Sequence, residues 1–346
     1  MKHPIFKKLL VLSFTGFIAG IFSASAEAGM DKAAIDAIYQ KAKKEGTVVV
    51  WGPQKNTLDY IEKNFNKDYP GIKVVTAASL RSGPKIIAEA KAGKHNLDVF
   101  IFPISSGMLP LYQRKLLAKG PWNEFGVPKE KQFLDGHVAG LNNLAYVVVY
   151  NTKFVKPEEV PNKWEDLLHP RWKGRLLGSP FLFPHLMSYF NLVWPDDRVA
   201  AYTRKMVNEQ KILLPRGPRE GFLKSGERHL VVGDFTQLSK IYRDHGVPTK
   251  YKFMDLTPSP QFTSAVMANA PHPNAGQLMA GWLTTDTAVK LRKQKYMFDL
   301  TPSSNSELAK EMRSSGTKHI LETAENFKPR KVNLKKFKPI ITGRKK

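Results

Sequence analysis

The sequence has 346 residues, of which 42% are hydrophobic and 24% are charged; its formal net charge is +24 and it contains no cysteine. Without cysteine the chain cannot form disulfides, thiolate nucleophiles or cysteine-ligated metal sites. Its length predicts two domains of ordinary size.

The first residues have the parts of a secretory signal peptide. Lys2, Lys7 and Lys8 precede a mostly apolar run over residues 9–21, and small residues suited to cleavage follow at 24–28. The apolar run is short for a membrane span, although an uncleaved anchor is the alternative. We therefore expect residues 1–28 to be cleaved and the mature protein to be soluble in the periplasm. No cysteine near the cleavage site offers a lipid attachment point.

Helices and strands alternate from Met30 onward. Asp31 is a suitable N-cap for a helix that Gly46 ends. Continuous apolar or β-branched runs then predict strands, and apolar residues at helical spacing predict helices between them. The predicted strands cover residues 47–51, 72–77 and 98–102, and the predicted helices cover residues 58–69 and 82–93.

The second part of the chain continues the same alternation. Strands are expected at residues 144–150 and 229–233, and helices at 199–210 and 274–283, with Asn274 as a cap. Strands and helices that alternate with short connections are typical of parallel α/β sheets. From these patterns alone, the chain is an exported α/β protein of two domains.

Motifs of the common enzyme classes are absent. The sequence contains no nucleophile elbow, Walker A loop, dinucleotide glycine fingerprint or His-Glu-x-x-His pair. His185 could be a ligand or a base, but we interpret it as a partly buried structural histidine. The adjacent Asp196 and Asp197 are interpreted as the entry turn of a helix.

Four segments in the mature region resemble one family. They are residues 87–100 (IAEAKAGKHNLDVF), residues 150–167 with YNTK and VPNKWEDL, residues 170–175 (PRWKGR) and residues 270–275 (APHPNA). In this order they resemble extracellular solute-binding proteins of the type II periplasmic fold, the group of ferric-iron, polyamine and phosphonate receptors of ABC importers. Trp164, Leu167 and Trp172 are expected to pack a core rather than to touch a ligand.

The resemblance implies an α/β fold of two lobes, with mainly parallel central sheets joined by hinge crossover strands. It places residues 29–142 and 265–325 in the first lobe, residues 143–264 in the second, and residues 326–346 in a basic C-terminal tail. It implies a monomer that binds a small-molecule ligand between its lobes and delivers it to an inner-membrane ABC permease. Hinge closure around the ligand would create the shape that the importer recognises. We expect no cofactor, no bound nucleic acid and no enzymatic activity.

The loops after the strands nominate the ligand contacts, because open α/β sheets bind ligands at the carboxyl ends of their strands. Arg81 beside Ser82 at a helix start would suit an anion. Simple capping is the alternative role of each serine. The candidate ligand-binding residues are Gln54, Asn56, Arg81, Ser82, Ser105, Ser106, Ser179, Asp234 and Thr236.

Ferric iron is the principal alternative ligand. Iron-binding members of the resembled group present two adjacent tyrosines after the strand that corresponds to residues 229–233, whereas here Tyr242 stands alone and the chain has no Tyr-Tyr pair. Polyamines need acidic pockets, and the excess of cations argues against them. We therefore predict a small organic anion, such as a phosphonate, a phosphate ester or a carboxylate, and no metal.

The positive charge allows a further class of function. Removal of residues 1–28, with three lysines and one glutamate, leaves +22, and nine Lys or Arg residues but no acid follow Glu325. We interpret the tail as a solvated, poorly ordered end. A surface-binding protein that uses the tail on anionic lipid, or an exported enzyme on a two-lobe scaffold, remains an alternative.

Overall fold

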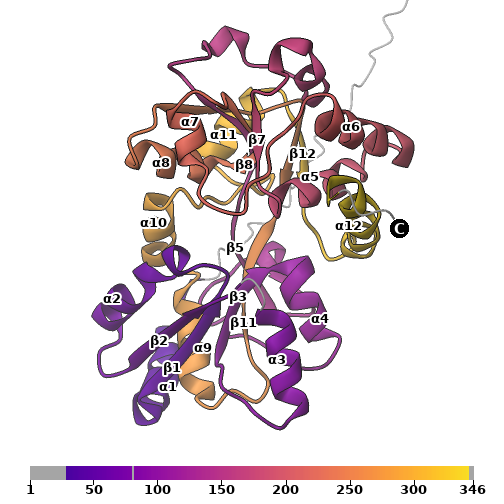
Figure 1. Cartoon of the computed structure of the whole chain (residues 1–346). Helices are drawn as coiled ribbons and strands as arrows, with labels where there is room; N and C mark the ends of the chain where they lie inside the picture. Colours follow the sequence, from indigo (N-terminus) through magenta and orange to yellow (C-terminus); the bar gives the residue numbers. More distant parts are fainter. Residues whose placement is uncertain (1–28, 80–81, 343–346) are drawn as a thin grey trace, which may run out of the picture.

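Two β-sheets, each packed between helices, organise the computed structural model, which describes residues 29–79 and 82–342 (Figure 1). The expected signal peptide, Arg81 and residues 343–346 lie outside the described residues. None of the described helices has the length and apolar character needed to cross a bilayer.

The first lobe is built on a six-stranded sheet of order β2-β1-β3-β11-β5-β4. Its strands are β1 (Thr47–Gly52), β2 (Lys73–Ala78), β3 (Val99–Pro103), β4 (Gln132–Phe133), β5 (Val138–Asn143) and β11 (Gln261–Val266). The pairs β1–β2 and β1–β3 are parallel, as the alternating pattern predicts. The strand β11, which returns from the second lobe, is antiparallel to both β3 and β5. The sheet is therefore mixed.

Side chains alternate along β3 between two cores. Val99 and Ile101 enter the core on one face of the sheet, whereas Phe100 and Phe102 enter the core on the other. This alternation follows from the two-residue period of a strand. The first face is covered by α1 (Lys32–Glu45), α2 (Asp59–Asp68), α9 (Pro273–Trp282) and α10 (Asp286–Gln294), and the second by α3 (Ser82–Lys91) and α4 (Leu109–Tyr112).

The ends of α1 match the sequence prediction, but the start of α9 does not. Asp31 accepts a hydrogen bond from the amide of Ala34 at 3.0 Å, and Gly46 ends α1 with φ of 69°. Asn274 is not the cap of α9, because the helix begins one residue earlier at Pro273. Instead, the amide and side chain of Asn274 donate to the Glu45 carboxylate at 3.1 and 2.6 Å. This contact ties α9 to the end of α1.

The second lobe is built on a four-stranded sheet of order β7-β8-β6-β9 with a parallel pair, β10-β12, beside it. Its strands are β6 (Tyr146–Asn151), β7 (Leu176–Gly178), β8 (Leu230–Phe235), β9 (Thr249–Lys252), β10 (Leu256–Ser259) and β12 (Lys318–Leu321). Its helices are α5 (Leu182–Phe190), α6 (Asp196–Asn208), α7 (Glu220–Lys224), α8 (Thr236–Asp244), α11 (Glu307–Ser314) and α12 (Phe327–Thr342). Because β6 is antiparallel to β8 and β9, this sheet is also mixed.

The aromatic residues of the family-like segments pack the core of the second lobe. Trp164, Leu167 and Trp172 are 0 to 3% exposed and belong to one apolar cluster with α5 and α6. The indole of Trp164 also donates to the carbonyl of Leu256 at 2.8 Å. The prediction that these residues are structural is confirmed.

The chain crosses between the lobes at residues 144–145, at Pro260 and again near Phe298. We expected residues 265–325 to lie in the first lobe, but only the part up to α10 does. After the third crossing, α11 packs Leu308 and Met312 into a second-lobe core, and β12 pairs with β10. The amphipathic pattern of α11 shows that the helix buries one face but not which sheet that face covers.

The basic C-terminal segment differs from the expected solvated tail. Residues 327–342 form α12, which packs against α5 and α6 (Figure 1). Arg330, Asn333 and Phe337 are buried, and Ile340 and Ile341 contact the same apolar cluster. These residues recur at helical spacing and form one face of the helix. The lysines lie mainly on the opposite, exposed face, which explains why composition alone suggested a tail.

A buried carboxylate joins two of the family-like segments. Asp98 accepts hydrogen bonds from the amide of Val49 at 2.7 Å, and from the amide and Nδ1 of His272 at 2.8 and 3.0 Å. The Asp98 side chain is fully buried. The LDVF and APHPNA segments, 174 residues apart, therefore meet at one polar contact that connects β1, the start of β3 and the loop before α9.

Candidate functional site

The strand ends of both lobes meet near the chain crossings. In the first lobe, the parallel strands β1 and β3 end at Gly52 and Pro103; in the second, the parallel strands β7 and β8 end at Gly178 and Phe235. Ala145, at the first crossing, accepts a hydrogen bond from the amide that follows Phe235 at 3.3 Å. The loops that follow these strands, which the sequence suggested as ligand contacts, therefore begin near the junction between the lobes.

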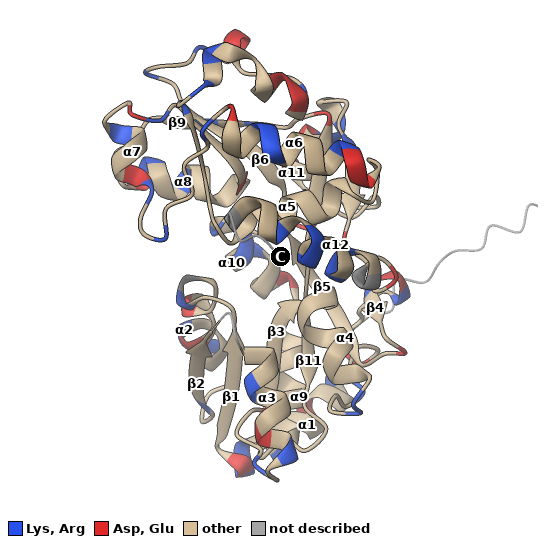
Figure 2. Cartoon of the chain, turned by 45° about the vertical axis from the view of Figure 1, so that its right-hand side comes forward, with Lys and Arg blue, Asp and Glu red and all other residues tan. Residues whose placement is uncertain are grey.

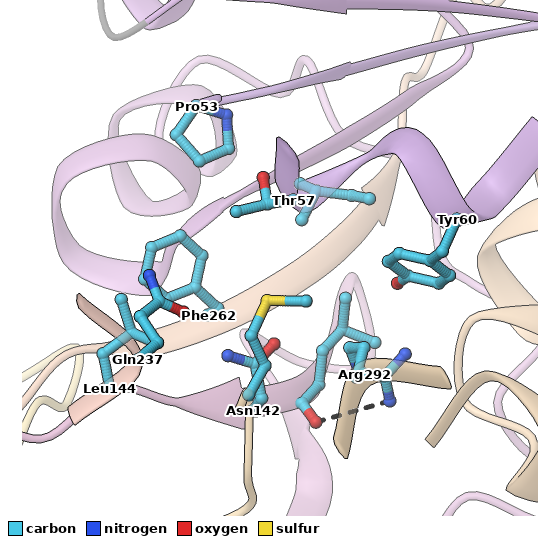
Figure 3. A pocket seen from close by; sticks show the side chains of 11 residues that line it. Pro53, Thr57, Tyr60, Asn142, Leu144, Gln237, Phe262 and Arg292 are labelled. Atoms are coloured by element: carbon cyan, nitrogen blue, oxygen red, sulfur yellow. Dashed lines mark hydrogen bonds between the residues drawn. The ribbon is translucent and has the colours of Figure 1, made fainter. Parts of the chain in front are cut away.

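A pocket that is open to solvent lies at this junction (Figure 3). The first lobe contributes most of the wall, the second lobe contributes one residue of α8, and two residues come from crossing segments. Its lining consists of Pro53, Thr57, Tyr60, Ile101, Leu141, Asn142, Leu144, Gln237, Phe262, Arg292 and Met297. Ligand pockets of proteins are concave and mostly apolar with a few polar groups, and this pocket has that composition.

The start of α8 lies beside the pocket and contributes one polar residue, Gln237, to its lining. Thr236 is the first residue of the helix and is 1% exposed, and its hydroxyl has no hydrogen-bond partner within the described chain. The preceding residue, Phe235, provides no side-chain cap. The next residue, Gln237, lines the pocket. Since helix N-termini present amide groups and partial positive charge, this end of α8 favours an anion.

None of the seven nominated residues whose side chains the structure describes lines the pocket itself. Gln54 is exposed beside the lining residue Pro53, and Thr236 adjoins Gln237. Asn56 lies next to the lining residue Thr57, but its side chain is outside the described set, and Arg81 is not described at all.

Two of the nominated serines form hydrogen bonds within their own turns. The hydroxyl of Ser82 donates to the carbonyl of Ser79 at 2.7 Å, and Ser179 accepts from the amides of Phe181 and Leu182 at 3.2 Å. Both therefore close the turns that begin helices. Ser106 is exposed on the turn after β3.

Ser105 has a different role, because it joins the two lobes. It lies in the π-helical turn Ile104–Met108 and its buried hydroxyl donates to Glu322, which follows β12. Glu322 also accepts from Arg330 of α12 and from the amide of Gln261 at the start of β11. The guanidinium of Arg330 lies 3.5 Å from the centre of the Tyr189 ring on α5. A buried polar network thus connects the turn after β3 with the C-terminal helix.

Asp234 belongs to the second-lobe interior rather than to the pocket. One carboxylate oxygen pairs with Arg219 at 2.5 Å, and the other accepts from the hydroxyl of Tyr242 at 2.6 Å. Burial and, secondarily, the nearby Asp234 charge raise the pKa of the Tyr242 phenol far above its ordinary value. Tyr242 is therefore held as a neutral donor, which does not suit a ferric-iron ligand.

The described residues also offer no carboxylate or imidazole metal site. Within residues 29–79 and 82–342, no group of three or more His, Asp or Glu side chains is placed to hold a metal ion. The pocket contains one phenol, that of Tyr60, and no acidic side chain. Hard cations such as Fe(III) prefer anionic oxygen ligands, so these residues do not fit an iron site of their own.

Several pocket residues were missed in the sequence. Leu144 and Phe262 lie close to the predicted lobe boundaries at residues 142/143 and 264/265. Gln237 follows the nominated residue Thr236, so all three positions could have been found from the sequence. Tyr60 and Arg292 had no such signal. Each lies on a helix whose sequence has an ordinary amphipathic pattern. Only the packing of the lobes places these two side chains at the junction.

His185 lies beside the C-terminal helix and is uncharged at neutral pH. Burial, followed by the charges of Arg330 and Lys338, lowers its pKa to about 4. Burial also lowers the pKa of His319 on β12 to about 4, and its Nε2 has no hydrogen-bond partner among the described residues. Both histidines are therefore held neutral by the folded second lobe, which agrees with the structural interpretation of His185.

Acidification is expected to destabilise the protein through these two histidines. Their pKa values in the folded state lie below the ordinary value of 6.5, so the unfolded chain binds the protons more readily. The free energy of unfolding should fall between pH 6.5 and about 4, by at most about 3 kcal/mol for each histidine. Urea titrations across this range will measure it. His319→Phe should flatten the pH dependence, whereas His95→Gln at an exposed site should not; equal slopes in all three proteins would contradict the assignment.

Comparison with known proteins agrees with this architecture. Residues 113–181 match the model of a family described as bacterial extracellular solute-binding protein, and this range includes the YNTK, VPNKWEDL and PRWKGR segments. No curated protein matches the sequence.

Solved structures share the fold at low sequence identity. Iron-bound HitA from Pseudomonas aeruginosa superposes with a TM-score of 0.69 at 16% identity, over 85% of this chain and 99% of that one. The substrate-binding protein of an ABC transporter from Agrobacterium tumefaciens gives 0.71 at 13%, over 85% and 94%. Apo ferric ion-binding protein A from Pasteurella haemolytica gives 0.69 at 18%, over 85% and 98%.

The two lobes and the crossings between them confirm the predicted two-lobed α/β fold, although both central sheets are mixed rather than mainly parallel. The matched segment adds the relation to extracellular solute-binding proteins. The chain therefore has the two-lobed fold of periplasmic binding proteins, and its residues 113–181 are similar to bacterial extracellular solute-binding proteins.

Proposed function

We propose that this protein is the periplasmic receptor of an ABC importer, which captures a small organic anion between its lobes and delivers it unchanged to a membrane permease. The observation that supports this proposal most directly is a pocket to which both lobes and two crossing segments contribute. A rotation of one lobe would change the shape of such a pocket, so ligand binding and lobe position are coupled.

The anionic character of the ligand is supported by the charges around the pocket. The lining contains Arg292 and no acidic residue, and the start of α8 adds its positive end. The protein as a whole has a large positive charge, which raises the encounter rate with anions. Secretion through a cleaved signal peptide, a monomeric state and the lack of enzymatic activity belong to the same proposal.

A thermal-shift screen of the chain from residue 29 tests this function. The panel contains carboxylates, phosphonates, sugar phosphates, polyamines and Fe(III) citrate. A true ligand stabilises the folded protein by mass action, by about 2.7 kcal/mol at a hundredfold excess over its Kd. An organic anion that raises Tm and is recovered unchanged supports a receptor. A bound anion that is converted to a product would instead indicate an enzyme, and stabilisation by none of the panel would contradict the proposal.

Ferric iron is the second candidate, because the similar structures include iron-bound HitA and ferric ion-binding protein A. The pocket offers one phenol and no carboxylate for it. If iron nevertheless binds, the protein should show a visible phenolate-to-iron absorption band, and Tyr60→Phe should abolish it. Binding of an organic anion without metal would exclude this alternative.

A negative charge placed in the pocket should weaken the binding of an anionic ligand but not that of a cation. Gln237→Glu is nearly isosteric and adds one negative charge to the lining, so we expect the affinity for an anion to fall about tenfold or more. Gln113→Glu makes the same change at an exposed position in the first lobe and should have no effect. Isothermal titration of both variants with the anion from the screen gives the comparison. Equal affinities would place the ligand elsewhere.

A further inference from the structure

The pocket contains a buried arginine with an unusual set of partners. Arg292 lies in the last turn of α10 and is 3% exposed. Its Nη1 donates to the carbonyl of Leu283 at 2.6 Å. Its Nη2 reaches the carbonyl of Leu141 at 3.5 Å, which is the dashed line in Figure 3. Both partners are neutral, and the second contact is long.

No carboxylate neutralises this arginine within the described chain. Elsewhere the protein pairs such groups: Arg330 with Glu322, and Arg219 with Asp234. Arg292 forms no ion pair of 4 Å or less with a described acidic residue, and an arginine side chain stays charged in proteins. A buried charge without a counter-charge is costly, so an anion that enters the pocket would gain a strong partner.

The rest of the lining limits what that anion can be. Apart from Arg292, the charged residue of the set, the polar residues are Thr57, Asn142 and Gln237, which are neutral. Aliphatic side chains and the rings of Tyr60 and Phe262 make up the remaining wall. A group with two negative charges, such as phosphate or phosphonate, would leave one charge without a partner in an apolar pocket. A single carboxylate would not.

We infer that Arg292 is the anchor of a site for small monocarboxylates with an apolar body, either aliphatic or aromatic. The carboxylate accepts hydrogen bonds from the guanidinium, and the neutral polar side chains are available to its second oxygen. The apolar body packs between the strands of the first lobe and the crossing residues Leu144 and Met297. This inference rests on the proposed function and narrows its ligand class.

The first test uses the wild-type protein alone. Hexanoate and benzoate are compared by isothermal titration with hexanamide and benzamide, which have nearly the same shape without the charge. Methylphosphonate, inorganic phosphate and Fe(III) citrate complete the series. We expect the carboxylates to bind about 10- to 100-fold more tightly than their amides and than the phosphorus anions. Equal affinity of acid and amide, or preference for a phosphonate, would overturn the inference.

The second test removes the charge of Arg292. Arg292→Met keeps the apolar stem and should lose the preference for carboxylate over amide, while Arg292→Lys should keep part of it. Lys290→Met makes the same charge change at an exposed position of the same helix and should bind like the wild type. Circular dichroism and the Tm of the unliganded variants report whether they fold. Retained discrimination by folded Arg292→Met would exclude Arg292 as the anchor.

The outcomes separate this inference from the broader proposal. A phosphonate or sugar phosphate that binds tightly and unchanged would support a solute receptor but refute the monocarboxylate class. If no compound in either series binds the wild type, both fail. If Arg292→Met does not fold, Arg292 has a structural role, and the comparison of acids with amides on the wild-type protein still decides the ligand class.

Discussion

Asp98→Ala is expected to lower the free energy of unfolding by about 3–6 kcal/mol, because three donors lose one buried acceptor. The amides of Val49 and His272 and the Nδ1 of His272 all contact this carboxylate at 2.7 to 3.0 Å. Each buried donor without a partner costs about 1–3 kcal/mol. The loss affects the contact between β1, β3 and α9, so the whole first lobe should loosen.

Urea unfolding followed by tryptophan fluorescence measures this effect. Asp98→Asn keeps one acceptor oxygen but turns an amide group towards a donor, so its cost should be intermediate. Asp36→Ala removes an exposed carboxylate from α1 and should change stability by no more than about 0.5 kcal/mol. A small effect of Asp98→Ala would show that water or neighbouring groups satisfy the three donors.

Arg330→Met is expected to destabilise the protein by about 3–5 kcal/mol, since it leaves the Glu322 carboxylate buried without its counter-charge. Glu322 is 3% exposed, and the partners left to its carboxylate, among them the hydroxyl of Ser105 and the amide of Gln261, carry no positive charge. The substitution also removes the stacking of the guanidinium on Tyr189. Since these groups connect both lobes with α12, the junction itself should weaken.

A double-mutant cycle separates charge from packing. Glu322→Gln combined with Arg330→Met removes both charges, so the double variant should be more stable than Arg330→Met alone. The basic residues of α12 are coloured blue in Figure 2. Lys336, on the same helix as Arg330, forms an exposed ion pair with Asp196 of α6, so Lys336→Met should destabilise the protein far less than Arg330→Met. Additive losses in the double variant would mean that Glu322 and Arg330 are not coupled.

Much of the first lobe could be predicted because its elements have local signals. The strand at residues 47–52 is a β-branched run, and the helix before it has a cap at each end that needs no tertiary information. The LDVF and APHPNA segments were recognised as family-like, but their shared purpose was not visible. Asp98 and His272 are 174 residues apart, and only the folded sheet brings them into contact.

The site could be located only in outline. Strand ends and lobe boundaries pointed to the junction where the pocket lies, and the lining residues Leu144, Gln237 and Phe262 lie within a few residues of them. Polar residue type did not identify the lining, because the side chains of Ser82, Ser179 and Asp234 form hydrogen bonds or ion pairs with neighbouring residues of the protein and lie outside the lining. Arg292 could not be selected among 54 basic residues, because its distinguishing property is burial without a carboxylate.

The amino-acid sequence by itself determined the elements, the order of strands and helices, and the two-lobed family to which the pattern is similar. These depend on periodicity, caps and turns, which act over a few residues. The tertiary structure alone decided that α11 and α12 belong to the second lobe, that Ser105 reaches Glu322, and that Arg292 faces a pocket. These outcomes depend on which apolar faces cover each other and on which buried charges find a counter-charge, and both are properties of residues that are distant in the chain.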